Sequence, residues 1–127
     1  MSRLLLDTQA ALWWDAASPS LGAQARAAIQ DAEAVFVSAA SEWELAIKAA
    51  LGRIELRRSM LDAATDAGFE PLTVSFRHAQ AVRGLKPLHR DPFDRLLVAV
   101  ARVEGLSLVT SDTFLADYAI VVIDAAR

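Results

Sequence analysis

Short apolar runs alternate with longer amphipathic stretches along the whole chain. Runs typical of strands, apolar and partly β-branched, cover residues 3–6, 35–38, 72–74, 106–109 and 119–123. Helical patterns cover residues 39–51, 59–67, a short stretch that ends at Gly84, and 92–104. Strands separated by helices pair in parallel through right-handed crossovers. The pattern therefore predicts an α/β fold, a three-layer α/β/α sandwich with a central, mainly parallel sheet.

The length and composition fit one domain that spans residues 1–127, because a chain with 54% apolar residues can build one sizeable core. No stretch approaches the roughly 20 apolar residues of a membrane span, and the start of the chain lacks the basic and apolar segments of a secretion signal. The lack of cysteine excludes disulfides and thiolate metal sites. We expect a cytoplasmic protein with no membrane segment.

The charge of the chain is ambiguous for nucleic-acid binding. A formal net charge of -3 is unfavourable, since phosphate backbones attract basic surfaces. If several of the 16 acids bind cations, however, the remaining surface with its 13 Lys and Arg is roughly balanced. The mean hydropathy of +0.29 is high for so small a domain. We therefore expect part of the apolar surface to face a partner.

Four acidic residues occupy similar positions in the predicted fold, each just after a strand or in the first turns of a helix. They are Asp7, Glu44, Asp94 and Asp112. In an open parallel sheet the carboxyl ends of the strands and the amino ends of the following helices meet along one edge, where ligands usually bind. Acids that are distant in sequence can therefore become neighbours, and this arrangement predicts a carboxylate-lined metal site.

These acids also have structural interpretations. Asp7 and Asp112 can cap the helices that follow them, and capping is the preferred interpretation of Asp7 taken alone. Asp91 stands directly before Pro92, which favours a helix cap. Asp94 falls inside the apolar face of its helix, where a carboxylate needs a specific partner. An arginine or the backbone amides of the helix start could be that partner, but the cost of burying an ion favours a functional role.

The helix at residues 39–51 offers two acids about 200° apart, so Glu42 and Glu44 cannot face the same site. We select Glu44 because it lies nearer to the apolar face that we expect to be buried. That face consists of Trp43, Ala46, Ile47, Ala50 and Leu51. Lys48, one turn beyond Glu44, either forms an ordinary surface pair with it or steers a phosphate and orients Glu44.

Three Asp and one Glu suit a hard divalent cation, Mg²⁺ or Mn²⁺, which prefers oxygen ligands. Such a cation could activate water and stabilise the charge on a phosphate, which is the chemistry of phosphodiester hydrolysis. His78 and His89 are too few and too scattered for a zinc site of the usual spacing. No glycine-rich phosphate loop or dinucleotide fingerprint is present, which argues against NTPases and dehydrogenases.

Four segments in order carry a family resemblance: LLLDTQAALWW, VSAASEWELAIK, HRDPFDRLLVAVA and LVTSD. Over nearly its whole length the chain resembles PIN-domain proteins of the VapC-like kind, the ribonuclease half of type II toxin-antitoxin modules. The resemblance assigns catalysis and metal binding to the same four acids, Asp7, Glu44, Asp94 and Asp112. It also implies Mg²⁺ or Mn²⁺, cleavage of RNA, a homodimer and a tightly bound antitoxin. The sequence departs from the pattern at Gln9, where this branch usually has His, so we assign no role to that position.

Other side chains near the predicted site have open roles. Ser38, Ser41 and Thr110 could hydrogen-bond the acids, although capping is the preferred interpretation. We expect both Trp13 and Trp14 to lie mainly in the core. A basic set could line an RNA path around the acids, although scattered solvated charge explains it nearly as well. The set is Arg53, Arg57, Arg58, Arg83, Lys86, His89 and Arg90.

Two other classes of function are open beside a metal-dependent endoribonuclease that acts as a toxin. A phosphoacceptor signalling domain also places acids at strand ends, but it fits poorly, because Ser75 follows the third strand and no Lys follows Ile123. A catalytically silent binding module with a PIN-like fold would bind no Mn²⁺ at the four acids.

Overall fold

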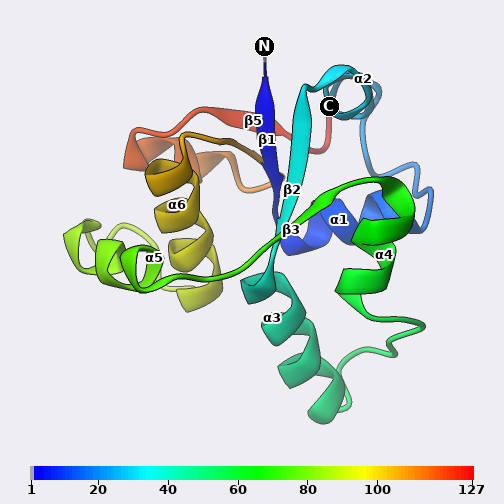
Figure 1. Ribbon diagram of the computed structural model, residues 1–127, viewed down its shortest axis with the longest axis horizontal. Coiled ribbons are helices and arrows are strands. Elements are labelled where there is room, and N and C mark those ends of the chain that lie inside the picture. Colours follow the sequence, from blue (N-terminus) through cyan, green and yellow to red (C-terminus); the bar gives the residue numbers. More distant parts are fainter. Residues whose placement is uncertain (1) are drawn as a thin grey trace.

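The computed structural model describes residues 2–127, which form a five-stranded parallel sheet in the order β3-β2-β1-β4-β5 (Figure 1). The strands are β1 Arg3–Leu6, β2 Ala34–Ser38, β3 Glu70–Leu72, β4 Ser107–Thr110 and β5 Val122–Asp124. All four strand pairings are parallel. The predicted α/β fold with a parallel sheet is confirmed.

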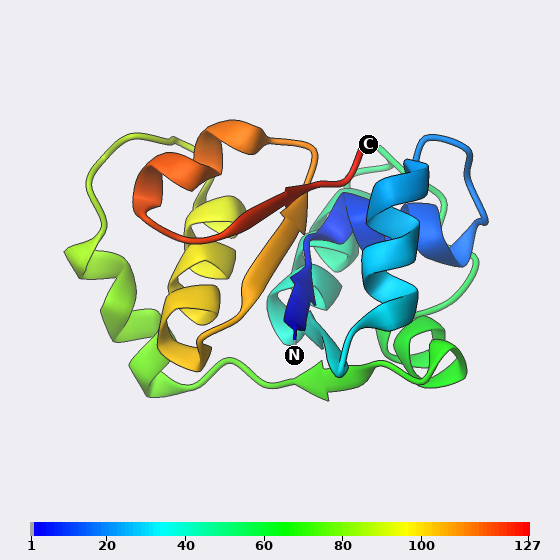
Figure 2. The same cartoon turned by 90° about the horizontal axis from the view of Figure 1, so that it is seen from above.

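Helices cover both faces of this sheet (Figure 2). The α-helices are α1 Thr8–Asp15, α2 Ala23–Asp31, α3 Ala39–Ala50, α4 Met60–Ala67, α5 Phe76–Ala81 and α6 Pro92–Glu104. Two 3-10 helices follow α5 and β4, η1 Val82–Gly84 and η2 Thr113–Tyr118. One core cluster joins the sheet to α1, α2 and α4, and a second joins it to α5, α6 and both 3-10 helices. Among residues 2–127, no helix combines the length and the apolar character that crossing a membrane requires.

The central strand β1 contributes to both core clusters. Leu4 and Leu6 belong to one cluster and Leu5 to the other, and all three are fully buried. This alternation is expected because successive side chains of a strand point to opposite faces, and a parallel strand covered on both faces reads as a continuous apolar run. Asp7 follows directly, so its backbone is held at the carboxyl end of the most deeply buried strand.

The boundaries of α6 are those that the sequence predicts. Asp91 caps the helix, Pro92 is its first residue, and Gly105 ends it in the left-handed conformation at φ 67°. Other boundaries differ. The third strand ends at Leu72 instead of starting there, and the last strand begins only at Val122, because η2 extends to Tyr118 and Ala119 ends it in the left-handed conformation. The apolar pattern of the sequence did not predict α2 or η2.

The predicted buried face of α3 is wrong. Trp43 is 57% exposed and Leu51 is 62% exposed, while Glu44 and Leu45 on another side of the helix are buried. The helix projects from the end of β2 beyond the sheet (Figure 1) and contacts α1, α4 and α6 as well as the adjoining strand β2. Its inward side therefore carries polar site residues, and its apolar stripe faces outward.

Candidate metal centre

All four predicted acids line a single cavity of about 290 Å³ at the carboxyl edge of the sheet. Asp7 follows β1, Asp112 follows β4 by two residues, Glu44 lies in the second turn of α3, and Asp94 lies in the first turn of α6. The parallel topology brings these positions together, because β1 is hydrogen-bonded to both β2 and β4. The structure thus gathers the acids that the sequence pattern selected.

Asp7 is both a helix cap and a wall of the cavity. Its Oδ1 accepts a 2.7 Å hydrogen bond from the backbone N–H of Ala10, which confirms the predicted cap of α1. Burial raises the pKa of Asp7, and nearby Glu44 and Asp112 raise it further, whereas the hydrogen bonds from Thr110 and Ala10 oppose the rise. Capping and lining the cavity are therefore compatible, since the hydrogen bond fixes the carboxylate at the edge of the sheet.

Glu44 is held by two side chains from different directions. Thr8 donates a 2.6 Å hydrogen bond to its Oε1, and the Lys48 ammonium lies 2.6 Å from its Oε2. Ser41 lies 2.9 Å from the Thr8 hydroxyl and extends this network. Glu42 points elsewhere and accepts hydrogen bonds from the backbone N–H groups at the start of α4, so Glu44 is the acid of this helix that faces the cavity.

Asp94 stands among other acids. Burial, followed by the charges of Asp91 and Asp7, raises the pKa of Asp94 to about 7, against a lowering effect of His89. Within residues 2–127 its ion-pair partner is His89, whose Nδ1 lies 3.9 Å from its Oδ2. Asp91 accepts hydrogen bonds from the backbone N–H groups of Phe93 and Asp94, which confirms its structural role as the cap of α6. Asp94 is thus a carboxylate without an arginine partner in a crowded acidic cavity.

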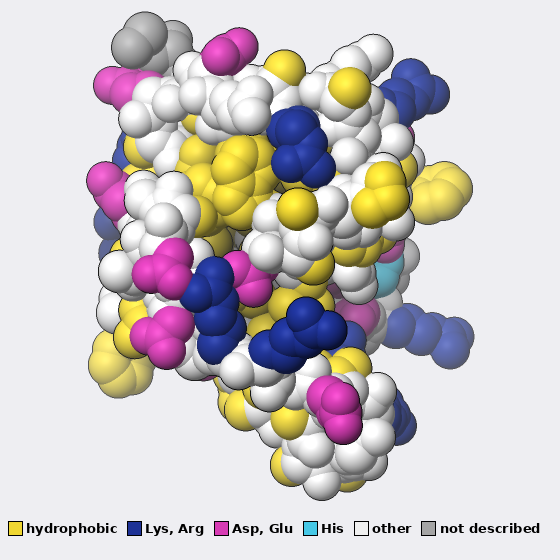
Figure 3. All heavy atoms as spheres, turned by 90° about the vertical axis from the view of Figure 1, so that its right-hand side faces the viewer, with side chains coloured by type: hydrophobic (Ala, Val, Ile, Leu, Met, Phe, Trp, Pro, Cys, Tyr) yellow, Lys and Arg dark blue, Asp and Glu magenta, His cyan; other side chains and the backbone are white. Residues whose placement is uncertain are grey.

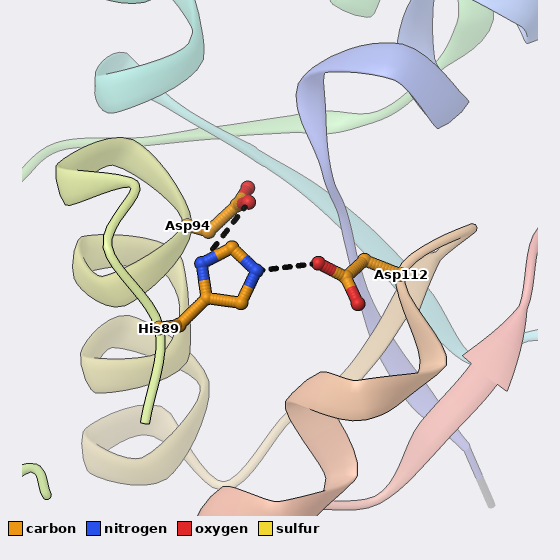
Figure 4. A group of neighbouring side chains, drawn as sticks. All are labelled: His89, Asp94 and Asp112. Carbon is orange, nitrogen blue, oxygen red and sulfur yellow. Dashed lines mark hydrogen bonds and ion pairs between the residues drawn. The ribbon is translucent and has the colours of Figure 1, made fainter. Parts of the chain in front are cut away.

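Asp112 forms a short hydrogen bond with His89, which the sequence pattern did not identify as a member of the site. His89 Nε2 lies 2.6 Å from Asp112 Oδ2 (Figure 4). The imidazole stands between Asp112 and Asp94, and suitable ligand atoms of the three residues all lie within 4.8 Å of one another. The Asp112 side chain makes no capping hydrogen bond to η2, so its predicted alternative as a cap is wrong.

The PIN domain family model matches residues 4–121 of the chain. The chain belongs to the PIN-domain family. The Ribonuclease VapC22 of Mycobacterium tuberculosis is 34% identical to this PIN domain over 115 residues, 88% of each chain. This identity confirms the resemblance to VapC-like proteins that the sequence motifs indicated.

Solved structures share the fold of this PIN domain. VapBC2 from Rickettsia felis, bound to a DNA fragment from its promoter, matches with a TM-score of 0.69 at 14% identity and covers 96% of this chain and 98% of its own. DNA-bound VapBC from Salmonella typhimurium matches with a TM-score of 0.67 at 17% identity over 98% of both chains. At these identities the likeness supports the PIN-like architecture.

The hydroxyl groups predicted to lie near the acids do contact this PIN domain's site. Ser38 caps α3, as expected, by accepting the N–H of Ala40. Thr110 is fully buried and links two acids, because it hydrogen-bonds Asp7 and accepts the backbone N–H of Asp112. Thr110 therefore holds the ends of β1 and β4 in register at the cavity. This role goes beyond the helix capping that was the preferred interpretation from the sequence.

The proposed basic path is only partly available. Arg58 forms ion pairs with Asp15 and Asp66, and His89 pairs with Asp112. On the face that Figure 3 shows, basic and acidic side chains lie next to each other instead of forming one basic surface. Trp13 and Trp14 pack partly buried against the core, as expected. Gln9 lines the cavity beside Asp7.

His89 could have been connected to the site from its position in the HRDPFD segment. It precedes the Asp91 cap by two residues, so the turn into α6 returns its ring toward the start of that helix. From the sequence, His89 is assigned to a possible RNA path around the acids and is excluded only as a zinc ligand. Its spacing relative to the acids of α6 is the signal that would have placed it beside Asp112.

Proposed function

We propose that this PIN domain is a metal-dependent endoribonuclease that acts as the toxin of a type II toxin-antitoxin module. The observation that carries the proposal is the meeting of Asp7, Glu44, Asp94 and Asp112 in one cavity. The 34% identity to a protein named as a ribonuclease favours RNA as the substrate.

The donor set fits a hard divalent cation. The four acids and the capping Asp91 line a cavity in which Lys48 is the one basic side chain among the lining residues. Burial, and after it the nearby negative charges, raises the pKa of Asp94 there. Mg²⁺ or Mn²⁺ held by the four acids would relieve that repulsion. When bound, the cation would supply activation of water and stabilisation of the phosphate charge during hydrolysis.

The residues around the acids hold them in fixed orientations. Thr8 and Lys48 each bind one oxygen of Glu44, and the backbone of Ala10 fixes Asp7. Groups that are already oriented need little rearrangement when substrate arrives, which is how electrostatic sites gain rate. Lys48 is 41% exposed at its side chain and can also attract an RNA phosphate at the mouth of the cavity.

The partner that we propose is an antitoxin protein, since the structural neighbours include toxin-antitoxin complexes. A mainly apolar pocket of about 220 Å³ lies beside the edge strand β3, between α3 and α4, and is lined by Met60, Leu61 and Leu72 among others. The outward stripe of α3, with Trp43 and Leu51, offers further apolar surface for a second copy in a homodimer. These surfaces supply the unburied apolar area that the hydropathy of the chain predicted.

The test is cleavage of a mixed RNA pool by the purified, antitoxin-free protein in Mg²⁺, Mn²⁺ or EDTA. We expect cutting with either metal, none in EDTA, and none by Asp94→Asn that remains folded by circular dichroism. Cutting that persists in EDTA would overturn the metal mechanism. Absence of both cutting and Mn²⁺ binding would favour the catalytically silent PIN-like module.

A further inference from the structure

His89 places its ring nitrogens beside two acids of the proposed metal centre, from a neighbouring pocket that shares Asp112 with the acidic cavity. It lies in the segment that leads into α6, and its ring is directed between Asp94 of α6 and Asp112 after β4 (Figure 4). Its Nε2 lies 2.6 Å from Asp112 Oδ2 and its Nδ1 lies 3.9 Å from Asp94 Oδ2. Its side chain is three-quarters buried, so the surrounding structure restricts its orientation.

The spacing of these atoms suits a shared cation. Ligand bonds of divalent cations to nitrogen and oxygen are about 2.0–2.2 Å long, so adjacent ligand atoms on one cation are about 3 Å apart and opposite ones about 4.3 Å. Ligand atoms of His89, Asp94 and Asp112 all lie within 4.8 Å of one another. Movements of a few tenths of an ångström would therefore be enough for the His89–Asp112 pair to bind one cation.

The two ring nitrogens have different surroundings. Nδ1 accepts a long 3.3 Å hydrogen bond from the backbone N–H of Asp91, so Nε2 carries the proton that is donated to Asp112. A cation bound at Nε2 would take the place of that proton, and the neutral ring would then hold its proton on Nδ1, in place of the long hydrogen bond from Asp91. There the Asp94 carboxylate is the neighbouring acceptor. A carboxylate on the far nitrogen of a ligating imidazole is a recurrent arrangement around protein metals.

We propose that His89 is a direct metal ligand, through Nε2 beside Asp112, and that it makes this centre selective for Mn²⁺ over Mg²⁺. The proposal rests on the metal site put forward under Proposed function and adds a fifth residue to it. Mg²⁺ favours oxygen ligands in near-ideal octahedral geometry, whereas Mn²⁺, a larger transition-metal ion, accepts an imidazole ligand more readily. The alternative is that His89 only orients Asp112 through their hydrogen bond.

Pulsed electron paramagnetic resonance of Mn²⁺ bound to the intact protein separates these two roles. A directly bound imidazole gives ¹⁴N modulation of the Mn²⁺ echo, and we expect this modulation in the wild-type protein. It should change to a ¹⁵N pattern when histidine alone is labelled with ¹⁵N, and it should vanish in His89→Gln. His78→Gln is the matched control, because His78 is the only other histidine of the chain and packs toward Glu104 outside the cavity.

Metal titrations supply the second readout. We expect His89→Gln to weaken Mn²⁺ binding about tenfold or more and Mg²⁺ binding less than about threefold. Bound Mn²⁺ without histidine ¹⁴N modulation, or equal weakening of both ions, would overturn the ligand role and leave the four-acid nuclease intact. Failure of the folded wild-type protein to bind Mn²⁺ would overturn the proposed metal site together with this inference.

Discussion

The hydroxyl of Thr8 donates a 2.6 Å hydrogen bond to Oε1 of Glu44, which joins the first turn of α1 to the second turn of α3. The two residues are 36 positions apart, and both are buried. Because Lys48 binds the other carboxylate oxygen, Glu44 is oriented from two sides. The residue directly after Asp7 thus fixes a second acid of the same cavity.

Replacing Thr8 by Val removes this donor while nearly conserving volume. We expect Thr8→Val to weaken Mn²⁺ binding and RNA cleavage by about tenfold, as is usual when a partner of a metal ligand is lost. Isothermal titration with Mn²⁺ measures the effect. Thr65→Val makes the same chemical change on exposed α4, where the hydroxyl donates only to Leu61 O, and should change neither quantity. Equal effects of the two variants would contradict the role of Thr8.

Metal binding should depend on pH through Asp94. Its pKa in the metal-free protein is raised to about 7, chiefly by burial, so a cation must displace a proton below that pH. We expect Mn²⁺ affinity to rise between pH 6 and pH 8, by about tenfold per unit below the pKa, and then to level off. Titrations at constant ionic strength measure this. An affinity that does not change between pH 6 and 8 would contradict the assignment.

The same carboxylate should cost stability when no metal is bound. Asp94 has an ordinary pKa of 3.8 but a pKa of about 7 in the folded protein, so the folded state holds the proton more tightly. The resulting stabilisation is complete below pH 3.8 and is lost as the pH rises to about 7. Asp94→Asn, which stays neutral, should therefore melt a few degrees higher than the metal-free wild type at pH 8.

That difference should disappear near pH 4 and reverse when Mn²⁺ is added at pH 8, because only the wild type then gains binding energy. Thermal unfolding followed by circular dichroism provides all three comparisons, metal-free at pH 8, near pH 4, and with Mn²⁺ at pH 8. A metal-free Asp94→Asn variant that is less stable than the wild type at pH 8 would show that the carboxylate has a stabilising partner instead.

The two leucines of α3 should differ sharply in their contribution to folding. Leu45 is 2% exposed and belongs to the core, whereas Leu51 is 62% exposed. Leu45→Ala should lower the free energy of unfolding by about 2–5 kcal/mol, and Leu51→Ala should lower it by less than about 1 kcal/mol. Urea denaturation, at a protein concentration low enough to keep any dimer dissociated, measures both. Similar losses for the two variants would mean that Leu51 is also buried, as the apolar periodicity predicted.

The sequence predicts the sheet, α6 and the four acids because each depends on local signals. Continuous apolar runs mark Leu4 to Leu6 as a buried strand, and Pro92 and Gly105 mark the two ends of α6. Asp94 is recognisable because it interrupts an apolar face. The parallel topology then requires that acids after different strands share one edge.

The orientation of α3 and the place of His89 could not be obtained in this way. Periodicity identifies an apolar stripe but not what covers it, and α3 extends beyond the sheet so that Trp43 faces outward. His89 reaches Asp112 through the path of an irregular segment, which hydrophobic patterning does not describe. The α2 helix was missed because its buried side consists of few residues, Ala25 and Ile29.

The central claim, that the acids of this cavity carry out metal-dependent RNA cleavage, is tested most directly by two substitutions in one helix. Glu44→Gln removes a cavity carboxylate, while Glu42→Gln makes the same change two residues earlier, where an amide oxygen can still accept from the start of α4. RNA cleavage in Mn²⁺ should fall at least about a hundredfold in Glu44→Gln and stay near wild type in Glu42→Gln. Equal activity of both folded variants would contradict the account.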